Sequence, residues 1–133
     1  MANILVIEDE AVVRSLFQHI ITGMGHQLDM AQDGATGLEW ARQREHAVII
    51  SDLHLPGEIS GMDLIRRLRA AKPHCPIVVV SGYPSAETLE ECEKLGITDF
   101  LTKPFEMTFV KTCIETILKT KAGVAPAQTK EQA

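Results

Sequence analysis

Five short apolar segments dominate this sequence, and a segment with helical spacing follows each of them. In the runs ILVI, AVII and IVVV, apolar residues succeed one another without polar residues in between. This pattern is typical of strands that are covered on both faces, as in a parallel sheet. It predicts strands over residues 3–7, 27–31, 47–51, 76–80 and 97–101.

The segments between these strands have apolar residues three and four positions apart, which predicts amphipathic helices. Four apolar stripes mark them: Val13, Leu16, Phe17, Ile20, Ile21 and Met24; Ala35, Leu38 and Ala41; Leu64, Ile65 and Leu68; and Val110, Cys113, Ile114, Ile117 and Leu118. Another helix is predicted over 85–95, because Pro84 precedes it and Gly96 ends it. Five strand–helix units in strict alternation predict a flavodoxin-like, doubly wound α/β domain with strand order 2-1-3-4-5 and five helices.

The composition changes after Lys121, where AGVAPAQTKEQA has no hydrophobic periodicity. The prediction is a single domain over residues 1–121 and a flexible tail over 122–133. Because only this tail follows the last helix, we expect no DNA-binding or enzymatic effector domain.

The net charge and composition argue against several classes of function. The formal net charge of −5 argues against nucleic-acid binding, which requires a basic face. No segment is apolar over the length that spans a bilayer, and the first residues lack the features of a signal peptide. Cys75, Cys92 and Cys113 are isolated, which indicates neither a disulfide framework nor a zinc site. We therefore expect a cytoplasmic domain with free thiols.

Polar residues stand at the ends of four of the predicted strands. They are Glu8 and Asp9, Asp52, Ser81, and Lys103. The carboxyl ends of parallel strands share one edge of the sheet, and ligands bind there beside the point where the strand order reverses. We therefore expect three acids, one hydroxyl and one amine to converge at this edge.

Clustered carboxylates restrict the chemistry of such a site. Two like charges about 4 Å apart repel by roughly 4 kcal/mol at an effective dielectric near 20, so three acids favour a bound cation or raised pKa values. Oxygen ligands beside one lysine suit Mg²⁺, and a carboxylate can accept a phosphoryl group as an aspartyl-phosphate. Taken singly, Asp52 is typical of a turn or cap, Ser81 of a turn and Lys103 of the surface, so the inference depends on their shared position.

Four fragments in order make the chain resemble the receiver domain of two-component response regulators. VIEDE resembles the acidic pair after the first strand, IISDLHLP the phosphoacceptor strand, VVVSGY the serine or threonine strand, and DFLTKPF the lysine–proline element. The resemblance covers residues 2 to about 120. Among receiver domains, the chain most resembles stand-alone receivers of the chemotaxis-regulator type.

The resemblance implies a role for each matching residue. Asp52 would accept a phosphoryl group, Asp9 would ligate Mg²⁺ directly, and Glu8 would act mostly through a water. Asp52 and the backbone carbonyl of His54 would complete the metal ligands. The domain would take part in its own phosphorylation and dephosphorylation, while its output would be regulatory binding rather than enzymatic turnover.

The same resemblance implies a switch at the neighbouring strands. Ser81 and Lys103 would bind phosphoryl oxygens, Gly82 would leave room for the group, and Ser81 would move together with Phe100. The Lys103-Pro104 peptide bond would be cis. One spacing departs from the family pattern, which places a glycine four residues beyond the loop proline. Here Gly61 lies five residues beyond Pro56, which indicates a one-residue insertion beside the site.

Partners also follow from the resemblance. The phosphoryl donor would be a sensor histidine kinase or a histidine phosphotransfer protein. A downstream protein would bind over the helix at 85–95, the strand at 97–101 and the last helix. The domain would be a monomer or a weak dimer, with no DNA or membrane partner.

Three alternatives remain open at this point. A phosphorelay intermediate would pass the phosphoryl group on to a histidine phosphotransfer protein. An Mg²⁺-dependent aspartyl phosphatase would place its nucleophile in a DxD pattern after the first strand, which EDE breaks. A nucleotide- or flavin-binding domain would have a glycine-rich loop there, and none follows the first strand.

The remaining polar and aromatic residues have structural interpretations. Trp40 lies off the apolar face of its helix, which predicts a part-exposed packing role. The residues His19, His26, His46 and His74 have no ligand spacing and are predicted at the surface or at caps. The EECEK run at 90–94 is predicted to be a solvated helix face, unless a partner binds it.

Overall fold

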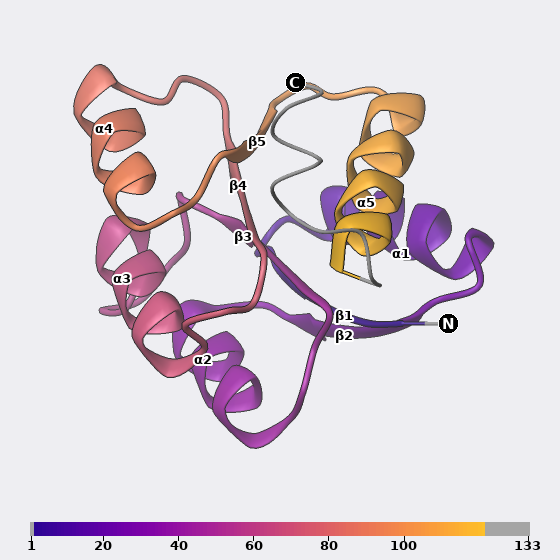
Figure 1. Cartoon of the computed structure of the whole chain (residues 1–133), viewed down its shortest axis with the longest axis horizontal. Helices are drawn as coiled ribbons and strands as arrows, with labels where there is room; N and C mark the ends of the chain where they lie inside the picture. Colours follow the sequence, from indigo (N-terminus) through magenta and orange to yellow (C-terminus); the bar gives the residue numbers. More distant parts are fainter. Residues whose placement is uncertain (1, 122–133) are drawn as a thin grey trace.

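The computed structural model describes residues 2–121, where five strands alternate with five helices (Figure 1). The strands are β1 (Asn3–Ile7), β2 (Gln27–Ala31), β3 (Val48–Asp52), β4 (Ile77–Ser81) and β5 (Asp99–Thr102). The helices are α1 (Ala11–Gly23), α2 (Gly34–Gln43), α3 (Gly61–Ala71), α4 (Ala86–Lys94) and α5 (Met107–Lys121). The predicted tail, residues 122–133, lies outside the described residues. No helix in the described part of the chain is long and apolar enough to cross a membrane.

The strands form one parallel sheet in the order β2-β1-β3-β4-β5, which confirms the predicted fold class and strand order. The strand order reverses between β1 and β3, where parallel sheets of this kind bind ligands beyond the strand ends. The register sets Asp52 beside Val80 and Ser81 beside Thr102. Asp52 and Ser81 therefore end adjacent strands at the same edge.

Both faces of the sheet are covered by helices. Helices α2, α3 and α4 lie on one face, and α1 and α5 lie on the other (Figure 1). In β1, Leu5 and Ile7 pack into the core cluster on the first face, whereas Ile4 and Val6 pack into the cluster on the second. This two-sided burial explains why the strand sequences do not alternate between apolar and polar residues.

Strand boundaries differ slightly from the prediction. β3 and β4 begin and end one residue later than expected, so Asp52 and Ser81 are the last residues of strands. Pro76 has no N–H to donate, although its carbonyl accepts a bond from the N–H of Ile49 at 3.0 Å. Ile97 was predicted in the last strand, but it precedes β5. It is buried, and its N–H donates to the carbonyl of Cys92 in the turn that closes α4.

The prediction that His46 lies at the surface or at a cap is wrong. Its side chain is only 1% exposed, and its Nε2 lies 2.8 Å from Oδ2 of Asp29 in β2. A buried imidazole requires such a partner, because an unpaired polar group is costly to bury. His19 and His74 are exposed as predicted, and His26 is half-buried.

The run at 90–94 is only partly a solvated face. Glu90, Glu93 and Lys94 are exposed, but Cys92 is fully buried and belongs to the core under α2, α3 and α4. Trp40 is half-buried against the same core, as predicted.

The segment between β3 and α3 passes close to the start of α2. A Cβ atom at Gly34 would collide with the backbone carbonyl of Ile59, so only glycine allows this approach. Gly57 has φ +95° and Gly61 has φ +57°, a backbone region that favours glycine. These glycines shape the segment in which the sequence indicates an inserted residue.

Candidate functional site

Four strands deliver polar side chains to the carboxyl edge of the sheet. Glu8 directly follows β1, Asp52 ends β3, Ser81 ends β4 and Lys103 follows β5. The backbone N–H of Lys103 donates to the carbonyl of Ser81 at 3.0 Å, which extends the pairing of β4 and β5 beyond the strand end. The Lys103-Pro104 bond is cis, which confirms what the resemblance implies.

The ammonium group of Lys103 joins three carboxylates. Its Nζ lies 2.9 Å from Oδ2 of Asp52, 3.0 Å from Oε1 of Glu10 and 3.2 Å from Oε1 of Glu8. An ammonium group has three N–H donors, so each of them has a carboxylate within reach. The structure thus brings together Glu8, Asp52 and Lys103 as predicted, and it adds Glu10.

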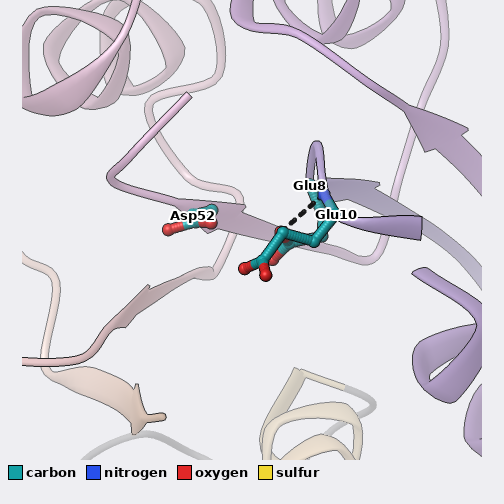
Figure 2. A group of neighbouring side chains, drawn as sticks. All are labelled: Glu8, Glu10 and Asp52. Atoms are coloured by element: carbon teal, nitrogen blue, oxygen red, sulfur yellow. Dashed lines mark hydrogen bonds between the residues drawn. The ribbon is translucent and has the colours of Figure 1, made fainter. Parts of the chain in front are cut away.

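The three acids differ in their exposure to solvent. Oxygens of Glu8, Glu10 and Asp52 lie within 4.8 Å of one another. Figure 2 shows the three side chains, with a dashed line for the bond from the N–H of Glu10 to Oε2 of Glu8, which measures 3.1 Å. The side chains of Glu8 and Asp52 are 1% and 2% exposed, whereas that of Glu10 is 61% exposed.

The electrostatics of the cluster favour a further cation. Burial raises the pKa of Glu8 to about 7, and the charge of Asp52 adds to this rise, while the N–H of Glu10 and the ammonium of Lys103 oppose it. Burial alone would lower the pKa of Lys103, but its hydrogen bonds to Asp52 and Glu10 raise it above its ordinary value. One lysine therefore faces three carboxylates, and the surplus negative charge is partly relieved by the raised pKa of Glu8.

Both oxygens of Asp52 have partners that fix the orientation of its carboxylate. Oδ1 accepts a hydrogen bond from the backbone N–H of His54 at 3.0 Å. Oδ2 accepts one from Lys103 at 2.9 Å. Asp52 is therefore held by the turn that follows β3 on one side and by the lysine after β5 on the other.

Asp9 lies at the same edge but outside the group of three clustered carboxylates. It is exposed and lines an open pocket together with Glu10, Asp52, His54, Gly82, Tyr83 and Lys103. The guanidinium of Arg14 donates to the backbone carbonyl of Asp9 at 2.7 Å, which fixes the backbone there. A direct metal contact from the Asp9 carboxylate stays a prediction, as does one from the His54 carbonyl.

Gly82 lines this pocket directly after Ser81, the last residue of β4. The hydroxyl of Ser81 is buried and has no hydrogen-bond partner among the described residues. A Cβ atom at Gly82 would meet nothing within 4 Å, so open space adjoins this position. Phe100 is half-buried and packs against the core under α2, α3 and α4. A role of Ser81 and Phe100 as a coupled switch stays a prediction.

Sequence reasoning missed the contact of Glu10 with Lys103. Glu10 immediately precedes α1, where an acidic side chain is common because it interacts favourably with the helix dipole. The only available signal was its place in the run Glu8-Asp9-Glu10. The spacing alone does not show which of these side chains turns toward Lys103.

The residues present fit a magnesium ion. Closely spaced carboxylate oxygens are the ligands that Mg²⁺ prefers, and backbone carbonyls and waters can complete its coordination. The surplus of acids over Lys103 and the raised pKa of Glu8 both indicate a site that lacks positive charge. The acidic cluster is therefore compatible with the Mg²⁺ that receiver domains bind.

Comparison with known proteins identifies what the chain is similar to. The family model described as "Response regulator receiver domain" matches residues 4–115. The Vibrio cholerae chemotaxis response regulator CheY4 has a similar solved structure, with 27% identity and a TM-score of 0.80, covering 89% of this chain and 99% of that one. These matches support the receiver interpretation and favour none of the three alternatives.

Curated relatives are longer than this chain. The virulence transcriptional regulatory protein PhoP of Salmonella typhimurium is 30% identical over 94% of this chain and 55% of its own length. The transcriptional regulatory protein ZraR of Escherichia coli is 26% identical over 98% of this chain and 30% of its own length. The chain therefore spans less than two thirds of each of these two relatives.

Proposed function

Because the chain belongs to the response regulator receiver domain family, whose members act as phosphorylation-dependent switches, we propose that Asp52 is its phosphoryl acceptor. The donor is a phosphohistidine on a sensor histidine kinase or a histidine phosphotransfer protein, the partners with which receiver domains interact. The observation that carries the proposal is the 2.9 Å contact between Oδ2 of Asp52 and Nζ of Lys103. It supports the proposal because a buried carboxylate lies beside a cation at the edge of the sheet where ligands bind.

In the proposed reaction, a carboxylate oxygen of Asp52 attacks the phosphorus of the phosphohistidine. An O–P bond forms while the P–N bond breaks. The imidazole leaves with the electron pair of that bond and takes up a proton. The product is an aspartyl-phosphate, whose negative charge lies on the phosphoryl oxygens.

Lys103 and Ser81 bind those oxygens. The raised pKa of Lys103 keeps its ammonium group charged, so that it can offset the charge of the phosphoryl group. The buried hydroxyl of Ser81 has no partner among the described residues, which leaves it free to donate to a phosphoryl oxygen. Open space beside Gly82 accommodates the group.

We assign the Mg²⁺ site to the carboxylates of Glu8, Asp9 and Asp52 and the backbone carbonyl of His54, with Glu8 acting through a water. The clustering of the acids and the raised pKa of Glu8 support this assignment. The charge that Mg²⁺ supplies when bound offsets the negative charge of the transferring phosphoryl group.

The output is regulatory binding. Phosphorylation draws the Ser81 hydroxyl toward the phosphoryl group, Phe100 repacks with it, and the surface formed by α4, β5 and α5 changes. Exposed apolar side chains on these helices support a partner there, since Leu89 is 41% exposed and Phe109 57%. The domain contributes only to its own phosphorylation and dephosphorylation and converts no other substrate.

Trapping of the acyl phosphate tests the proposal directly. Borohydride reduces an aspartyl-phosphate to homoserine, so peptide mass spectrometry after treatment with acetyl phosphate and Mg²⁺ locates the modified residue. We expect homoserine at position 52. Modification of another acid, such as Asp9 or Glu10, would contradict the assignment of Asp52.

A further inference from the structure

In the unphosphorylated site, carboxylates already surround the ammonium group of Lys103. All three N–H donors of the ammonium group face carboxylates, those of Asp52, Glu10 and Glu8. To bind a phosphoryl oxygen of the incoming donor, while Asp52 is still a charged carboxylate, the lysine must give up at least one of these contacts.

The buried acids are poor candidates to leave. Glu8 and Asp52 are almost fully buried. Besides Lys103, each accepts a hydrogen bond from a backbone N–H. Glu8 accepts from Glu10 at 3.1 Å, and Asp52 accepts from His54 at 3.0 Å. Before the transfer, moving either carboxylate away from Lys103 would leave a charge buried without its cationic partner, which is costly.

Glu10 differs from Glu8 and Asp52 both in its exposure and in its hydrogen-bond partners. Its side chain is 61% exposed, and its carboxylate has no hydrogen-bond partner other than Lys103 among the described residues. An exposed carboxylate exchanges a protein contact for water at small cost, because exposed ion pairs contribute little free energy. Glu10 is thus the contact that Lys103 can release most easily.

We propose that Glu10 is an exchangeable anchor of Lys103, which holds the ammonium group in the unphosphorylated site and gives way to the phosphoryl group. Glu10 is a positioning residue in this account, because it acts through Lys103. The inference rests on the proposed function, since it requires phosphoryl transfer to Asp52.

An anchor role of Glu10 can be distinguished by experiment from a purely structural role. The charge of Glu10 adds to the negative potential that attracts Mg²⁺, but it opposes an anionic phosphodonor and competes with it for Lys103. Removing the charge should therefore change cation binding and phosphorylation in opposite directions. Damage to the fold of the site would weaken both.

Glu10→Gln tests this while keeping the size of the side chain. The control is Glu58→Gln, which makes the same change of charge at an exposed residue with no ion pair among the described residues. Calorimetric titration of the unphosphorylated proteins gives the Mg²⁺ dissociation constant. Intact mass spectrometry at saturating Mg²⁺ gives the rate constant for phosphorylation per unit concentration of acetyl phosphate.

We expect Glu10→Gln to weaken Mg²⁺ binding and to raise the phosphorylation rate constant, each by about two- to five-fold, with no comparable change in Glu58→Gln. If Mg²⁺ affinity and the phosphorylation rate constant both stay constant, both fall, or change equally in the control, the anchor role is overturned. If the wild-type chain gains no phosphoryl group at all, the proposed function of Asp52 fails first, and the anchor role fails with it.

Discussion

The Nζ atom of Lys103 lies 2.9 Å from Oδ2 of Asp52, although 51 residues separate the two in the sequence. The contact exists because β3, β4 and β5 are neighbours in the sheet, and because the backbone of Lys103 is bonded to Ser81 at the end of β4. Among the described residues, Lys103 is the only basic side chain that forms ion pairs with the buried carboxylates of Glu8 and Asp52. The stability of the site and its proposed chemistry therefore depend on the same lysine.

Lys103→Met should destabilise the protein most when Mg²⁺ is absent. The substitution leaves Glu8 and Asp52 buried without their cation, so we expect the free energy of unfolding to fall by about 2 kcal/mol at pH 8. Mg²⁺ should restore more stability to the variant than to the wild type, because the remaining cluster is more negative. Urea denaturation followed by circular dichroism, with and without Mg²⁺, measures both effects.

The control for this substitution is Lys111→Met on α5, an exposed lysine without an ion pair among the described residues. It should change stability little under either condition. An equal loss of stability in both variants, or a loss in Lys103→Met that Mg²⁺ leaves unchanged, would argue against neutralisation of the cluster by Lys103.

Gly34→Ala should destabilise the protein through the segment that follows Asp52. The added Cβ meets the carbonyl of Ile59, so we expect a loss of about 1–3 kcal/mol and a slower phosphorylation as the segment shifts. Gly23→Ala is the matched control, because a Cβ atom there meets nothing within 4 Å at the end of α1. The control should be neutral or stabilising by up to about 1 kcal/mol. Equal stability of the two variants in urea would contradict the close approach at Gly34.

The fold was largely predictable because the apolar residues of this chain form two clear patterns, continuous runs in the strands and helical spacing between them. The runs of β1, β3 and β4 are continuous because both faces of each strand are buried, and this pattern predicts a parallel sheet. Boundaries were less predictable, since a buried residue need not be in a strand. Ile97 is apolar and buried, yet its N–H closes α4.

The site was predictable in its strand ends but not in its contacts. Asp52, Ser81 and Lys103 converge because parallel strands share their carboxyl edge. Which acid of the run after β1 turns toward Lys103 depends on side-chain geometry at the start of α1, so the contact of Glu10 was missed. The burial of His46 was missed for a similar reason, because nothing in sequence spacing links it to Asp29.

The pair of Asp29 and His46 gives a prediction for acid stability. Burial alone would raise the pKa of Asp29, but hydrogen bonds from His46 and Arg44 lower it below its ordinary value of 3.8. The carboxylate of Asp29 therefore takes up a proton at a lower pH in the folded state than in the unfolded state. The resulting stabilisation is complete above the unfolded pKa and is lost as the pH falls through the lower folded value.

Asp29→Asn should therefore lower the free energy of unfolding by about 2 kcal/mol at pH 7, and the difference from wild type should shrink below pH 3.8. Asp63→Asn, which breaks an exposed ion pair with Arg67, should cost less than about 1 kcal/mol at pH 7. Urea denaturation across this pH range provides the comparison. A difference for Asp29→Asn that grows toward acid pH would contradict the lowered pKa.

Intact mass spectrometry after incubation with acetyl phosphate tests the central claim, that Asp52 accepts a phosphoryl group in a magnesium-dependent reaction. Wild type and Asp52→Asn are compared, each with Mg²⁺ and with a chelator. The account predicts the added mass of a single phosphoryl group in the wild type with Mg²⁺, little or none with the chelator, and none in the variant. Equal modification of the variant, or no modification of the wild type under either condition, would contradict it.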